Sequence, residues 1–193
     1  MINLPIDFLN KMEQLLQDDY PAFLESYSRP SKKGVRLNPL KCTWDILEKN
    51  LPFTLSPSPF SPLSYYIEEE EAKVGILPLH HAGVFYSQEP SAASAVTVLN
   101  PKPGEIILDL CAAPGGKSTQ IAGLLDGKGL LWSNEIVKNR ANVLLSNIER
   151  LGVRNAVVSS CHPDVLCSKL AGFFDKVLVD APCSGEGMFR RDE

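Results

Sequence analysis

The chain has 193 residues, of which 44% are hydrophobic and 22% are charged. This length has room for one full domain, or one domain with a small appendage, and the composition is that of a folded globular protein. The 19 basic and 23 acidic residues give a formal net charge of −4. Because no global positive charge draws the chain to nucleic acid or to an anionic membrane, any such partner must be bound by a local patch.

Two classes of site are not supported by the sequence. No apolar run approaches the length of a membrane span, and the N-terminus lacks a basic segment followed by an apolar one, so we expect a cytoplasmic protein without a membrane partner. The five cysteines are scattered, with no C-x-x-C pair, which favours reduced thiols. Cys161, His162 and Cys167 lie close together, but zinc needs further ligands, and we therefore predict no metal.

The first part of the chain, residues 1–85, is predicted to be a small α+β module. Apolar residues at helical spacing predict a helix from Ile6 to about Asp19, with a short second helix opened by Pro21. The segment Val35–Leu40 is typical of a strand, and Thr43 is placed to begin a helix that runs to Leu51. Four prolines between residues 52 and 62 predict a connecting loop without regular structure.

A basic stretch lies in this module between residues 29 and 41, where no acidic residue occurs. It is a candidate surface for the phosphates of a nucleic acid, and a solvated basic loop beside a strand is the alternative. The basic residues of the stretch are Arg29, Lys32, Lys33, Arg36 and Lys41.

The second part, residues 86–193, is predicted to be an α/β domain. A helix over Ala92–Leu99 is followed by strands that alternate with helices, a pattern that predicts a parallel, right-handed sheet covered on both faces. The predicted strands are Ile106–Leu110, Gly129–Ser133, Ala156–Ser160 and Lys176–Asp180, and the predicted helices between them are Lys117–Leu125 and Val137–Leu151.

Ligands of such sheets bind beyond the carboxyl ends of the strands, and two features stand there. Small residues follow the first predicted strand and would let the backbone approach a ligand before a helix begins. Glu135 follows the second strand, at the position where these folds accept hydrogen bonds from ribose hydroxyls. Together they predict an adenosine-type cofactor. The residues of the loop are Cys111, Ala112, Ala113, Pro114, Gly115, Gly116 and Lys117.

Two types of cofactor compete for this loop. Gly116-Lys117-Ser118 resembles the end of a nucleotide-binding P-loop, so an NTPase is an alternative, but the P-loop pattern requires glycine where this chain has Cys111. The loop also departs from the G-x-G-x-x-G pattern of dinucleotide-binding proteins. S-adenosylmethionine suits the loop and the ribose-binding acid better than a triphosphate.

The fourth predicted strand runs into Asp180-Ala181-Pro182-Cys183-Ser184-Gly185-Glu186-Gly187. This segment and Asp109-Leu110-Cys111-Ala112-Ala113-Pro114-Gly115-Gly116-Lys117-Ser118 resemble the two long motifs of the Nol/Nop/Sun family of RNA (cytosine-5-)methyltransferases, and within it the bacterial ribosomal RNA methylases. The resemblance covers nearly all of the chain. It implies a Rossmann-like class I methyltransferase sheet, here truncated after its fourth strand, with a small N-terminal RNA-facing module.

The resemblance also implies roles for individual residues. The 111–117 loop and Glu135 would bind S-adenosylmethionine. Asp180, which also borders the cofactor, would hydrogen-bond the target cytosine around N3 and N4, and Lys117 would pair with Asp180. Cys183 would assist product release, because the family's nucleophilic cysteine lies in a later T-C motif.

That later motif does not occur before Glu193. We therefore expect an N-terminal fragment that transfers no methyl group by itself. By resemblance its substrate is RNA, with ribosomal RNA favoured over transfer RNA. A non-catalytic RNA-binding protein with a methyltransferase fold is a further alternative. The family usually places an acid near the adenine, where this chain has His162 and Asp164, and the sequence does not decide whether either makes that contact.

Overall fold

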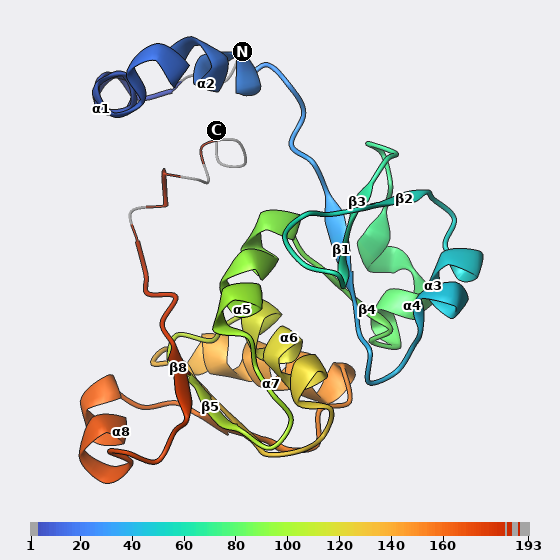
Figure 1. The fold of residues 1–193 in the computed structure, drawn as a ribbon, viewed down its shortest axis with the longest axis vertical. Helices are drawn as coiled ribbons and strands as arrows, with labels where there is room; N and C mark the ends of the chain where they lie inside the picture. The colour runs from blue at the N-terminus through green and yellow to red at the C-terminus, as the bar shows by residue number, and fades with distance from the viewer. Residues whose placement is uncertain (1–3, 184, 187–188, 190–193) are drawn as a thin grey trace. The chain divides into compact units, whose positions relative to one another are not determined.

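The computed structural model describes residues 4–183, 185–186 and 189, and these fall into two compact units. One unit joins the residues up to Ser31 with those from Pro182 onward, and the other comprises Lys32–Ala181. Figure 1 shows the elements of each unit. No helix within the described residues is long and apolar enough to cross a membrane.

The first unit is built on two short helices joined by a 3₁₀ turn. They are α1 (Ile6–Leu16), η1 (Gln17–Asp19) and α2 (Tyr20–Ser26), so the predicted first helix is confirmed as far as Leu16. Phe8, the residue of α1 that is buried, packs against Phe23 of α2 and Phe189, with ring centroids 6.0 and 4.9 Å apart. Lys11 and Glu186 form a salt bridge of 3.0 Å.

The second unit begins with an antiparallel sheet in the order β2-β3-β1-β4. Its strands are β1 (Gly34–Leu37), β2 (Leu55–Pro57), β3 (Ser64–Ile67) and β4 (Phe85–Ser87), and its short helices are α3 (Trp44–Asn50), η2 (Val74–Ile76) and α4 (Pro78–His81). Val35, Leu47 and Phe85 are at the centre of its core. The prediction that the prolines exclude regular structure is wrong, because β2 forms among them. An edge strand such as β2 tolerates a proline, since one side of its backbone has no ladder to complete. The expected domain boundary after residue 85 falls inside β4, which pairs with β1.

A four-stranded parallel sheet follows, in the order β7-β6-β5-β8. The chain enters it through η3 (Pro90–Ala93) and α5 (Ser94–Leu99). Its elements are β5 (Ile106–Asp109), α6 (Gly116–Leu125), β6 (Leu130–Asn134), α7 (Lys138–Arg150), β7 (Ala156–Ser159), α8 (Pro163–Lys169) and β8 (Lys176–Leu178). The predicted strands and helices are confirmed within a few residues at their ends, whereas α8 was not predicted.

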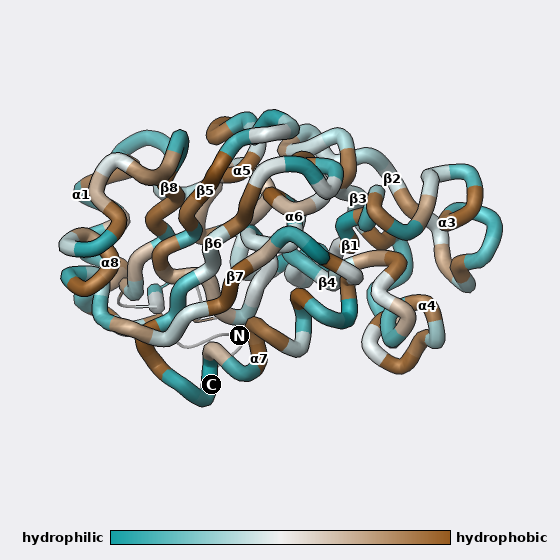
Figure 2. The backbone as a smooth tube through the Cα atoms, turned by 90° about the horizontal axis from the view of Figure 1, so that it is seen from below, coloured by the Kyte–Doolittle hydropathy of each residue, from teal (hydrophilic) through white to brown (hydrophobic). Residues whose placement is uncertain are grey.

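Helices cover both faces of this sheet, as the alternating pattern predicts (Figure 1). On one face Ile107 and Leu131 are fully buried against α6 and α7 in the main core. On the other face the Trp132 ring meets Phe174 at 6.1 Å, and Leu108 lines a cavity with residues of α8. Figure 2 shows the hydrophobic character of β5 and β8. In the described part of the chain β8 pairs with β5 alone, and Val177 is 48% exposed.

Candidate functional site

The strand order of the parallel sheet reverses between β5 and β8. From β5 the chain moves outward through β6 to β7, and it then returns to β8 on the other side of β5. Open α/β sheets bind ligands at such a switch point, beyond the carboxyl ends of the strands. Three acidic residues lie at or just after these ends: Asp109 at the end of β5, Glu135 after β6 and Asp180 after β8.

The loop after β5 is anchored to the neighbouring strand ends. The amide of Ala112 donates to the Asn134 carbonyl at 2.8 Å. The Asn134 side chain is buried and donates to the carbonyls of Leu110 and Cys161, while its Oδ1 accepts from Ser159 and from the Cys161 amide. One amide side chain therefore joins the ends of β5, β6 and β7.

Helix α7 holds the same loop from another side. Arg140 donates to the Ala113 carbonyl at 3.1 Å, and Asn147 donates to the Pro114 carbonyl at 2.8 Å. These two α7 residues are seven positions apart and so share one face of the helix. With its carbonyls bound in this way, the backbone of the loop is fixed before any ligand enters.

Gly115 is the N-cap of α6 and has a φ of +109°, a conformation that favours glycine. The first intrahelical bond runs from the Thr119 amide to the Gly115 carbonyl at 2.9 Å. The amides of the three residues between them have no acceptor within the helix and carry its positive end. This helix start can therefore receive an anionic group of a ligand.

Asp109 is completely buried at the end of β5. Its Oδ2 accepts a hydrogen bond of 2.7 Å from Ser118, while its Oδ1 has no hydrogen-bond partner among the described residues. Burial raises the pKa of this carboxyl to about 6, and the Asp180 charge adds to that effect, whereas Ser118 and Lys117 oppose it. A buried oxygen without a donor is the kind of acceptor that a bound cation or N–H group would satisfy.

Glu135 is 3% exposed at the end of β6. Its Oε1 accepts from the Val137 amide at 3.0 Å, and its Oε2 lies 3.4 Å from Arg140. A carboxylate offers about four acceptor positions, so these contacts leave room for hydroxyl donors.

The predicted pairing of Lys117 with Asp180 is confirmed, with 2.6 Å between Lys117 Nζ and Asp180 Oδ2. Cys111 lies in the same environment. Burial raises the pKa of its thiol, and the charges of Glu135, Asp109 and Asp180 raise it further. The structure thus gathers the acids around the loop, and it keeps Cys111 protonated rather than activating it as a nucleophile.

The residues predicted to contact RNA are separated by the structure. Arg36 is 2% exposed, and its guanidinium bonds to Gln88, Gly116 and Thr119, so its prediction as a surface phosphate contact is wrong. Lys32 and Lys33 are exposed. Lys33 donates to the Glu70 carbonyl, and Lys32 lies 5.0 Å from the Tyr66 ring centre.

The other two basic residues have protein partners as well. Lys41 donates to the carbonyls of Ala82 and Arg150, and Arg29, in the first unit, pairs with Glu25 at 2.5 Å. Both side chains are exposed, so for them a phosphate contact stays a prediction.

The three other residues singled out in the sequence, His162, Asp164 and Cys183, are exposed. His162 is the N-cap of α8, and its side chain accepts a hydrogen bond of 3.3 Å from the Asp164 amide. Cys183 belongs to the first unit and is exposed. The expected role of Cys183 in product release stays a prediction, as does an adenine contact by His162 or Asp164. Ser184 and Gly187, which belong to the same motif as Cys183, lie outside the described residues.

Among the described residues no group of three or more His, Cys, Asp or Glu could hold a metal.

Two families of known proteins match this chain, and one of them covers the site. The profile of the family described as 16S rRNA methyltransferase RsmB/F matches residues 96–193, which include all the strand ends described above. The chain belongs to the 16S rRNA methyltransferase RsmB/F family. A second profile, the N-terminal domain of 16S rRNA methyltransferase RsmF, matches residues 4–90.

Relatives of the RsmB/F family match over the full chain. The chain is 40% identical over 204 residues to "Ribosomal RNA small subunit methyltransferase F" of Vibrio vulnificus, and 40% identical over 201 residues to the protein of that name from Vibrio parahaemolyticus. These matches cover 100% of the chain and 43% and 42% of the relatives, so the chain spans less than half of their length. A solved methyltransferase homolog protein from Pyrococcus horikoshii is 30% identical, with a TM-score of 0.80, over 98% of this chain and 67% of that one.

Sequence reasoning missed several residues of this RsmB/F site. Asp109 opens the first of the two long motifs, so its position could have indicated a role. Asn134 immediately precedes Glu135 and carried no signal of its own. Arg140 and Asn147 could have been found only by asking which face of the predicted helix meets the loop.

Proposed function

We propose that this chain is the cofactor-binding part of an S-adenosylmethionine-dependent methyltransferase that forms 5-methylcytosine in ribosomal RNA of the small subunit. The observation that carries the proposal is the buried Asp109 oxygen without a partner, which lies at the switch point of a family-typical sheet together with the buried Glu135. A purely structural carboxyl would be expected to have both oxygens satisfied.

The residues of the site fit this cofactor. Glu135 would accept hydrogen bonds from the ribose hydroxyls, and Asp109 Oδ1 would accept one from the ammonium of the methionine part. The free amides at the start of α6 suit its carboxylate. When bound, the cofactor supplies a methyl group on a sulfonium that an electron-rich carbon can attack.

Asp180 and Lys117 would act on the target base. The carboxylate of Asp180 is held in direction by Lys117, and it would accept a hydrogen bond from the amino group of cytosine. In cytosine-5 methylation, a thiolate adds to C6, C5 takes the methyl group, and the C5 proton is then lost as the thiol is eliminated. That final proton loss gives the proposal a specific signature.

The signature can be measured as tritium release. The full-length protein is incubated with S-adenosylmethionine and small-subunit ribosomal RNA that carries cytidine tritiated at C5. We expect one tritium released for each methyl group transferred, and loss of both in Asp180→Asn. Methyl transfer without tritium release would show that the methylated atom is not C5.

The two halves of the chain would divide the work. We propose that residues up to about 90 face the RNA and that the parallel sheet binds the cofactor. The two profile matches, 4–90 and 96–193, support this division. Since ribosomal RNA is the proposed substrate, the cytoplasm is the proposed location.

The RNA-facing role predicts a salt effect. Lys32 and Lys33 are exposed and adjacent, and replacing both by alanine should remove about two phosphate contacts. The slope of log affinity against log salt concentration should then fall by about 1 to 2, with little dependence on the RNA sequence. Filter binding from low to moderate salt measures this slope. Lys49→Ala with Lys73→Ala changes the net charge equally, and an equal loss of slope in that control would contradict a specific contact.

A further inference from the structure

The Arg36 guanidinium is a buried cation without an acid. It is 2% exposed, and no carboxylate is among its hydrogen-bond partners in the described part of the chain. Burial lowers the pKa of Arg36 to about 9, and the coulombic influence of Tyr86 opposes this. Placing an unpaired charge inside a protein opposes folding, and an apolar side chain could fill the same space. The groups that accept hydrogen bonds from the guanidinium should therefore explain why a charged residue occupies this position.

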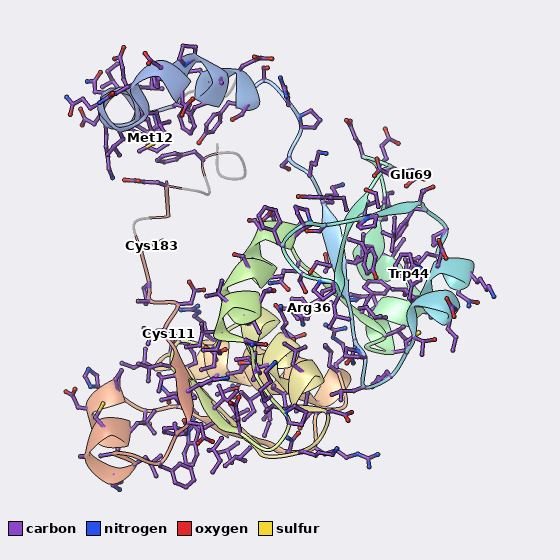
Figure 3. The ribbon with its side chains drawn as sticks, viewed as in Figure 1. Met12, Arg36, Trp44, Glu69, Cys111 and Cys183 are labelled. Carbon is purple, nitrogen blue, oxygen red and sulfur yellow. The ribbon has the colours of Figure 1, made fainter. Side chains whose placement is uncertain are left out.

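Those donors converge on the start of α6. Nη1 donates to the Gly116 carbonyl, and Nη2 donates to Thr119 Oγ1 at 2.7 Å. The Thr119 hydroxyl donates in turn to the Gly115 carbonyl at 2.7 Å. Figure 3 shows Arg36 between β1 and the helices of the second sheet. The Arg36 side chain thus holds Gly116 directly and Gly115 through Thr119.

The neighbours of Arg36 complete this support. Nη1 also donates to Gln88 Oε1 at 2.5 Å, and the guanidinium carbon lies 5.2 Å from the Tyr86 ring centre. A Cβ at Gly116 would come within 3.4 Å of Tyr86 Cε1 and 3.6 Å of Gln88 Nε2. The first turn of α6 therefore lies directly on residues of the N-terminal sheet and the segment that follows it.

The loop is consequently held from two sides. Arg140 and Asn147 of α7 donate to the carbonyls of Ala113 and Pro114, and Arg36 of β1 donates to the carbonyl of Gly116. The planar guanidinium can reach Gly116, Gln88 and Thr119 at once because its donors form a fixed fork, which the ammonium of a lysine cannot reproduce.

We propose that Arg36 is a positioning residue that sets the start of α6, through Gly116 and Thr119, in the geometry that binds S-adenosylmethionine, and so makes cofactor affinity depend on the N-terminal module. This inference rests on the proposed function. Arg36 contacts the cofactor loop and not the cofactor or the RNA.

Asn38 offers a matched control. It lies two residues further along the chain and is also buried. Its side chain donates to the carbonyls of Gly83, which precedes β4, and Leu151, which follows α7, so it too connects the antiparallel sheet to the parallel one. Leu151 follows the C-terminal end of α7, one turn beyond Asn147, and neither Gly83 nor Leu151 belongs to the loop of residues 111–117. Asn38→Ala should therefore weaken the fold without altering the loop.

The test compares binding of S-adenosylhomocysteine with thermal stability in the full-length protein. Arg36→Lys and Thr119→Val should each raise the Kd about tenfold or more, since each removes one or two hydrogen bonds of the loop support. Thr119→Ser, which keeps the hydroxyl, should bind like the wild type. Asn38→Ala should lower the melting temperature and leave the Kd within about twofold. Arg36→Lys should also leave the salt dependence of RNA binding unchanged, because Arg36 makes no phosphate contact.

Each alternative result is decisive. An unchanged Kd in folded Arg36→Lys, or an equal rise in Asn38→Ala, would overturn the proposal. If Arg36→Lys does not fold, Thr119→Val and Thr119→Ser decide the question by the same comparison. Failure of the wild-type protein to bind S-adenosylhomocysteine would instead contradict the proposed function, and this inference would fall with it.

Discussion

Glu135→Gln is expected to weaken binding of S-adenosylhomocysteine by about 10- to 100-fold, because hydrogen bonds to a charged acceptor contribute about 1.5 to 3 kcal/mol. Glutamine keeps the shape of the side chain and can still accept from the Val137 amide, so the fold should persist. Calorimetric titration of the variant measures the change. Glu149→Gln, at an exposed position of α7, is the control and should bind normally. Equal affinity in both variants would remove Glu135 from the site.

Asp109→Asn is expected to make the protein more stable and the cofactor site weaker. The native pKa of about 6 lies above the ordinary value of 3.8, so ionising the carboxyl costs the folded state about 3 kcal/mol at pH above 6. At pH values between the ordinary pKa and the native one, Asp109 is protonated in the folded state and ionised in the unfolded state. The free energy of unfolding of the wild type should therefore fall as pH rises from about 4 to 6. Asparagine cannot ionise, so the stability of Asp109→Asn should equal that of the wild type near pH 3.5 and exceed it by about 1 to 3 kcal/mol at pH 7.

Denaturant unfolding at several pH values measures the stability change in Asp109→Asn, and calorimetry measures the cofactor affinity. We expect affinity to fall in the variant, because its amide offers a donor where the ammonium of the cofactor needs an acceptor. Asp126→Asn, at the exposed end of α6, should change neither quantity. A variant that is no more stable at pH 7, and binds as well as the wild type, would show that Asp109 is an ordinary structural residue.

The parallel sheet could be predicted from the sequence because its signals are local. Apolar strands such as 106–110 alternate with helices that have clear stops at residues such as Gly152, and this alternation predicts a parallel sheet with right-handed connections. The N-terminal sheet was harder to predict. Its strands β2 and β4 are three residues long, and β2 contains a proline, so neither shows a periodicity that distinguishes it from a loop.

The sequence predicted those site residues that belong to a recognisable sequence motif. Lys117 and Asp180 belong to two long motifs, and their ion pair was predicted and found. Arg36 was misassigned because a basic stretch predicts an exposed surface, whereas strand β1 turns this one side chain inward. Its partners Gly116 and Thr119 lie about 80 residues away in sequence, and no local pattern indicates such a contact.

Binding of the cofactor itself tests the account most directly. The chain is titrated calorimetrically with S-adenosylhomocysteine and, separately, with ATP and magnesium. The account predicts micromolar binding of S-adenosylhomocysteine, weakened about 10- to 100-fold in Glu135→Gln, and no heat from ATP. Micromolar binding of ATP with magnesium, and none of S-adenosylhomocysteine, would contradict it and would assign the loop from Cys111 to Lys117 to a nucleotide triphosphate.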